Sequence, residues 1–221
     1  MIQRVKLSDR KLPNYSVCEE LVNALTHGLG AAFGAVALVL CLLKASTGLE
    51  LTAAAIYGVC TVVLYSVSSV YHGLRPGMAK KVLQVIDHCT IYLLIAGSYT
   101  VVSLTALQPH YPALAWGLVA FQWILAAIAI TLTAIDLRAF RVFSMICYIG
   151  MGWAIVPFIR EIRFVLGLRG FYYLLWGGLA FTAGAVLYGL GSKVRWFHSL
   201  FHIFVLLGSI LQFIAIYFYA I

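Results

Sequence analysis

Two histidines near the end of the chain, His198 and His202, lie four residues apart in an apolar stretch. On a helix, this spacing places both side chains on one face, with their Cβ atoms about 6 Å apart. Both imidazoles could then bind one metal ion, since neutral imidazole is a frequent zinc ligand. Polar side chains are costly in such a helix, so a pair on one face indicates a function.

His72, at the end of an earlier apolar stretch, is the third candidate ligand. Three imidazoles from two helices are a typical catalytic zinc set, because they leave the fourth position open for water. The alternative is that His72, His198 and His202 are solvated at the membrane interface or hydrogen-bonded to backbone carbonyls. Their expected position at one membrane depth favours the metal site.

Asp87 is the first candidate catalytic residue, and it lies just inside the start of another apolar stretch. A carboxylate at such a position costs roughly 2.5–3.5 kcal/mol unless a partner compensates it. Asp87 could hold or deprotonate a metal-bound water as a general base. It could instead form an ion pair with Lys80, Lys81 or Arg195 at the level of the lipid headgroups.

Ser68 is the second candidate catalytic residue, four residues before His72 on the same helix face. Its hydroxyl could support a metal-bound ligand, or it could bond to the backbone carbonyl one turn earlier. Glu20, Asn23 and His27 share one face of the first apolar stretch, where a structural or gating role is expected. His27 is the alternative ligand if one of the three histidines is not part of the site.

The elements that must position these residues are membrane helices. The chain has 221 residues, of which 63% are hydrophobic and only 10% are charged, and its mean hydropathy is +1.00. A soluble domain of this size could not bury so much apolar surface. The apolar runs are about 20 residues long, which predicts helices rather than barrel strands. We therefore expect an all-α integral membrane protein.

Seven apolar stretches are long enough to cross a membrane, and they predict a seven-transmembrane helix bundle. Residues 1–19 form a cytoplasmic N-terminal segment in this interpretation, and residues 20–221 form the transmembrane domain. The predicted spans are 20–43, 51–73, 82–107, 111–135, 142–159, 171–190 and 196–220.

Loop charges predict the orientation. The net charge of +8 comes mostly from basic residues between the spans, where they set topology rather than bind nucleic acid. Eleven of them fall on one side: Arg4, Lys6, Arg10, Lys11, Arg75, Lys80, Lys81, Arg138, Arg141, Lys193 and Arg195. The positive-inside rule then places the N-terminus in the cytoplasm and the C-terminus outside. All candidate site residues would lie near the cytoplasmic edge of the membrane.

The same residues form motifs that resemble those of the progestin and adiponectin receptor superfamily, and most closely its bacterial hemolysin III branch. The resemblance covers nearly the whole chain and is specific in its motifs. These motifs are Glu20-x-x-Asn23-x-x-Thr26-His27, Ser68-x-x-x-His72, the segment from Asp87 to Gly97, and His198-x-x-x-His202.

This resemblance implies a seven-helix protein of the bacterial cytoplasmic (inner) membrane with zinc as its cofactor. His72, His198 and His202 would hold the zinc, Asp87 would contact the zinc-bound water, and Ser68 would support them. The related receptors are thought to hydrolyse lipid amides such as ceramides. Membrane lipids are therefore the expected substrates or ligands, while the oligomeric state stays open.

Three functions remain open at this stage. The first is a zinc-dependent hydrolase that acts on a lipid amide or ester from the cytoplasmic leaflet. The second is a non-enzymatic sensor or regulator of membrane fluidity in which the metal only joins helices. The third is a cytolytic pore, which ranks last because few ionisable residues are available to line an aqueous path.

Overall fold

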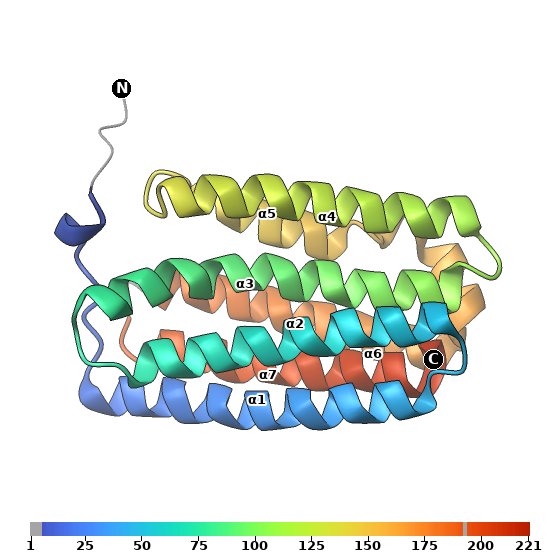
Figure 1. The fold of residues 1–221 in the computed structure, drawn as a ribbon, viewed down its shortest axis with the longest axis horizontal. Helices are drawn as coiled ribbons and strands as arrows, with labels where there is room; N and C mark the ends of the chain where they lie inside the picture. Colours follow the sequence, from blue (N-terminus) through green and yellow to red (C-terminus); the bar gives the residue numbers. More distant parts are fainter. Residues whose placement is uncertain (1–5, 192–193) are drawn as a thin grey trace.

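The computed structural model describes residues 6–191 and 194–221, and these residues form helices and connecting segments without any strand. Figure 1 shows the helices running side by side as one bundle. Their bounds are α1 (Val17–Lys44), α2 (Gly48–Gly73), α3 (Met78–Val102), α4 (Pro112–Ile135), α5 (Arg141–Trp153), α6 (Ile159–Gly191) and α7 (Phe197–Ala215). Single turns add η1 (Leu7–Asp9), η2 (Ser103–Leu107), η3 (Val156–Phe158) and η4 (Ile216–Ala220).

Six segments among the described residues are long and apolar enough to cross a membrane. The expected all-α, multi-pass membrane protein is thereby confirmed. Five of the six segments correspond to the predicted spans one to four and seven. The remaining segment, Arg141–Gly191, extends over 51 residues and contains both the predicted fifth and sixth spans. Arg4 and Lys193, two of the basic residues used to predict orientation, lie outside the described residues.

The region between α5 and α6 differs from the sequence prediction. The predicted fifth span continued to residue 159, whereas α5 ends at Trp153 and a short turn containing Pro157 follows. Proline cannot donate the hydrogen bond that continues a helix, which explains the early end. The predicted connection over residues 160–170, for which a short interfacial helix was compatible with the sequence, is largely helical, except at Gly167, whose φ of 64° interrupts α6. Glycine adopts this left-handed conformation without steric cost.

Close packing of α1 on α2 depends on Gly30. A Cβ atom at this position would overlap the ring of Tyr65, which is fully buried. The ring cannot move aside easily because its hydroxyl bonds the Oγ atom of Ser209 on α7 at 2.7 Å. Small residues of this kind let membrane helices approach closely.

We therefore expect Gly30→Ala to lower the free energy of unfolding by about 1–3 kcal/mol, as overpacking of a buried contact does. The measurement is thermal or denaturant unfolding of the purified protein in detergent. Gly117→Ala on α4 is the matched control, because a Cβ there meets no atom within 4 Å. Equal destabilisation by both variants would contradict the close-packing role of Gly30.

The alternation of helix direction brings distant parts of the chain together at one end of the bundle. In Figure 1, the starts of α1, α3, α5 and α7 lie at the same end as the last turns of α2 and α6, while the C-terminus lies at the opposite end. The end of α2, the start of α3 and the start of α7 carry the sequence motifs. Topology alone therefore gathers those motifs at one depth.

Candidate metal site

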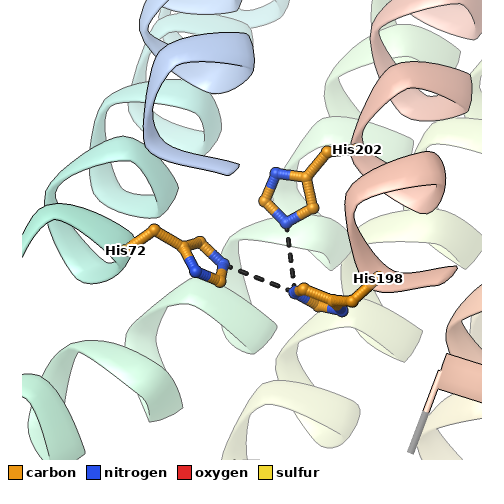
Figure 2. A group of neighbouring side chains, drawn as sticks. All are labelled: His72, His198 and His202. Carbon is orange, nitrogen blue, oxygen red and sulfur yellow. Dashed lines mark hydrogen bonds between the residues drawn. The ribbon is translucent and has the colours of Figure 1, made fainter. Parts of the chain in front are cut away.

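Three histidine side chains converge at this end of the bundle (Figure 2). His72 lies in the last turn of α2, and His198 and His202 lie in the first two turns of α7. All three are buried, with exposed fractions of 2%, 8% and 1%. The Nε2 atom of His198 lies 3.4 Å from that of His72 and 3.2 Å from that of His202.

These distances fit a metal ion better than hydrogen bonds. Each imidazole nitrogen carries either one proton or one lone pair, so Nε2 of His198 cannot bond well to both neighbours. Nitrogens held 2.0–2.1 Å from a tetrahedral zinc would be about 3.3 Å apart, close to both observed separations. One ligand atom from each histidine lies within 4.8 Å of the others, so the group could hold a metal ion.

Glu20 on α1 orients the first of these histidines. Its Oε2 atom lies 2.6 Å from Nδ1 of His72, and its Oε1 atom accepts a hydrogen bond from Nζ of Lys80 at 2.7 Å. A carboxylate only accepts, so Nδ1 of His72 carries the proton and Nε2 presents its lone pair to the site. Carboxylates hold metal-binding histidines in this way. The sequence suggested Glu20 as structural but did not point to Lys80 as its partner.

We expect Glu20→Gln to weaken metal affinity by about 10–100-fold, because a supporting carboxylate raises the basicity of the ligand it orients. Competition against a chromogenic zinc chelator measures this affinity. Glu161→Gln, at the start of α6 and the opposite end of the bundle, is the control and should leave affinity unchanged. An unchanged affinity in Glu20→Gln would show that the His72 contact does not tune the site.

The other polar residues of the α1 face also reach the histidines. Asn23 is fully buried, with its Nδ2 atom 3.5 Å from Nδ1 of His72. The ring centroid of His27 lies 3.7 Å from that of His202. Both ring nitrogens of His27 are buried and have no hydrogen-bond partner. His27 thus stacks beside the metal-binding group and is not part of it.

Two residues before and at the start of α1 hold the beginning of α7, and sequence reasoning missed both. Glu19 completes a capping box with Ser16 and also accepts a hydrogen bond from the backbone N–H of Trp196 at 2.8 Å. Tyr15 stacks on the ring of His198, with centroids 4.7 Å apart and an interplanar angle of 14°. Burial raises the pKa of Tyr15 well above its usual value, so its phenol stays neutral. The capping pattern predicts only a helix start, not these distant contacts.

Asp87 and Ser68 lie beside the histidines. Both line a narrow apolar cavity of about 130 Å³ inside the bundle, and the Ser68 hydroxyl interacts with the Asp87 carboxylate. Asp87 also lines a wider cavity of about 1000 Å³, which contains His198 and Tyr15 on its wall. Asp87 therefore lies where a polar cavity and an apolar one meet.

The basic residues considered as partners of Asp87 have other contacts. Lys80 binds Glu20, Lys81 donates to the backbone carbonyl of Ser8, and Nε of Arg195 lies 3.8 Å from Glu19. None of these three contacts involves Asp87, whose Oδ2 atom lies 4.0 Å from Nδ1 of His88.

Comparison with known proteins identifies the family. The sequence profile described as "Haemolysin-III related" matches residues 15–213, a range that includes every residue of the site. The chain belongs to the haemolysin III family. This membership confirms the resemblance that the sequence motifs indicated.

Three relatives illustrate how far the family extends. "Hemolysin-3" of Bacillus cereus is 37% identical over 208 residues, which cover 93% of each chain. The "Hemolysin-3 homolog" of Bacillus subtilis (strain 168) is 31% identical over 210 residues, covering 94% of this chain and 97% of the relative. The human "Monocyte to macrophage differentiation factor" is 26% identical over 172 residues, covering 74% and 68%. The last match connects this haemolysin III family protein with the progestin and adiponectin receptor superfamily.

Proposed function

We propose that this haemolysin III family protein is a zinc-dependent hydrolase of lipid amides or esters. The observation that carries the proposal is the convergence of three imidazole nitrogens, 3.2–3.4 Å apart along two edges, with the half-buried Asp87 carboxylate lining the same cavity as His198. Zinc at such a site lowers the pKa of water toward about 7 and polarises a carbonyl group. Imidazole ligands in a buried site with an open fourth position favour zinc over calcium or magnesium.

The protein's own residues supply the remaining parts of the reaction. Asp87 accepts the proton of the attacking water as a general base, and Ser68 holds the carboxylate in place. The apolar cavity next to them receives an acyl chain. A second apolar cavity of about 90 Å³ shares Ser98, Tyr99 and Trp153 with the first and extends it toward the opposite end of the bundle.

We also infer seven membrane crossings with a cytoplasmic N-terminus. A straight helix of 51 residues would be about 77 Å long, more than twice the ~30 Å hydrocarbon thickness, so Arg141–Gly191 is expected to cross twice. The interruption at Gly167 and the turn at Pro157 supply the reversal. Basic residues gather at the end of the bundle that carries His72, His198 and His202. They support the placement of this end at the cytoplasmic face of the inner membrane.

The test is turnover by the zinc-loaded chain in lipid nanodiscs. Short-chain fluorescent ceramide and matched esters, with and without a phosphate on the headgroup, serve as substrates, and the release of fatty acid is measured. Hydrolysis that stops on chelation and returns with zinc supports the proposal. Absence of turnover on the whole panel, with zinc bound, would overturn it.

A structural metal is the second candidate, favoured by one observation. The histidines join α2 to α7, while Glu20 adds α1 to the same group of contacts. A metal at this position would hold three helices together at one end of the bundle, as a sensor or regulator of membrane state requires. Zinc that raises the unfolding temperature without any turnover would favour this function.

A further inference from the structure

The cavity of about 1000 Å³ that is lined by His198 and Asp87 is strongly cationic, and it is called the vestibule below. It is formed by the segment before α1, by the first turns of α3, α5 and α7, and by the end of α6. Two carboxylates line it, Glu19 and Asp87. Five cationic side chains outnumber them: Arg10, Lys11, Arg138, Arg141 and Arg195. Its volume of about 1000 Å³ is that of a small-molecule site.

Arg10 gives this charge a specific focus. Its side chain is 7% exposed, and its Nη2 atom donates to the carbonyl of Ile135 at 3.2 Å and lies 4.0 Å from Oδ1 of Asp136. The Nε and Nη1 atoms are buried and have no hydrogen-bond partner. A buried donor without an acceptor is unfavourable. The free N–H groups of Nε and Nη1 point along different edges of the guanidinium, and each can donate a hydrogen bond to an oxygen of a phosphate.

The vestibule and the apolar cavity meet at a shared wall made by Asp87, Met145, Tyr148 and Tyr188. A lipid with its headgroup in the vestibule and its chain in the apolar cavity would pass this wall, with His198 alongside. The end of a transmembrane bundle also lies at the depth of the lipid phosphates. Charge, free donors and depth thus indicate the same chemical group.

We propose that the vestibule binds the phosphate group of a lipid headgroup, with Arg10 as its principal contact and Arg141 as a second. As a statement about substrates, this inference rests on the proposed hydrolase function: the lipids cleaved would carry a phosphate. As a statement about binding, it does not depend on turnover.

The test measures the binding of ether-linked lipids, which contain no bond the enzyme could hydrolyse. Dioctyl-glycerol phosphate and dioctyl-glycerol have the same chains and differ only in the phosphate, and inorganic phosphate is the third probe. Binding to the full zinc-loaded chain in nanodiscs is followed for the wild type, Arg10→Gln and Arg141→Gln. Arg75→Gln is the control, because Arg75 is exposed in the link between α2 and α3 and does not line the vestibule.

We expect the phosphate-bearing lipid to bind the wild type about tenfold or more tightly than dioctyl-glycerol. Arg10→Gln should remove most of this preference, Arg141→Gln should reduce it, and Arg75→Gln should retain it. Because Arg10 is buried, its variant could fail to fold, and the exposed Arg141 then decides the result. Equal binding of both lipids, or an undiminished preference in folded variants, would overturn the proposal.

Competition with inorganic phosphate separates two sources of the same group. A lipid ligand predicts that inorganic phosphate displaces dioctyl-glycerol phosphate only at far higher concentration. Displacement at similar concentrations would assign the vestibule to free phosphate and overturn the lipid assignment. Phosphate-dependent binding without turnover on any lipid would leave this site standing and count against the hydrolase alone.

Discussion

Replacing His202 with alanine is expected to remove the metal from the purified protein. His202 contributes one of the three converging nitrogens, and its side chain is 99% buried between α1, α2 and α7. Removing a supporting residue costs about 10–100-fold in affinity, so removing a ligand should cost more. We expect about one zinc per chain in the wild type and almost none in His202→Ala, measured by elemental analysis after purification in detergent.

His110→Ala is the matched control for this experiment. His110 is exposed in the connection between α3 and α4, at the opposite end of the bundle, so its loss should leave the zinc content unchanged. Chelation should lower the unfolding temperature of the wild type and of His110→Ala but not that of His202→Ala. A wild type without stoichiometric metal would end both the hydrolase and the structural-metal proposals.

Asp87→Asn is expected to abolish most lipid hydrolysis while the zinc stays bound. Asparagine has nearly the same shape as aspartate but cannot accept the proton of the attacking water. Loss of a general base typically lowers kcat by about 10²–10⁴-fold. The measurement compares fatty-acid release and zinc content in the same preparations of wild type and variant.

Asp9→Asn, an exposed change in η1, controls for the loss of one negative charge at the same end of the protein. Normal turnover in Asp87→Asn would show that another group takes the proton. A parallel loss of zinc and activity would instead assign Asp87 to holding the metal. Retained zinc with lost activity is the result that separates catalysis from a purely structural site.

Much of the candidate site could be predicted from the sequence, for a physical reason that applies to most helical membrane proteins. The bilayer sets the length of each span, and short connections force neighbouring spans to alternate in direction. The depth of every residue then follows from its position along the chain. His72 at the end of one span and His198 at the start of another must lie at a similar level.

Lateral neighbours were not predictable in this way. Depth placed Lys80 near both Glu20 and Asp87, but only the packing of α2 against both α1 and α3 decided that Lys80 binds Glu20. Tyr15 lies outside every predicted span, so no periodicity indicated its stacking on His198. The predicted end of the fifth span and the predicted start of the sixth were also wrong, because hydropathy does not show where Pro157 and Gly167 interrupt a helix.

By itself, the sequence determined an all-helical membrane protein, its family motifs, and the residues with which it could bind a metal. These properties depend on composition and on spacing within single helices. Tertiary structure alone decided that three imidazole nitrogens converge, that Glu20 orients one of them, and that Arg10 lines a vestibule next to Asp87. Such contacts depend on how helices rotate and pack against one another, and the polarity pattern of each helix leaves several arrangements of similar energy.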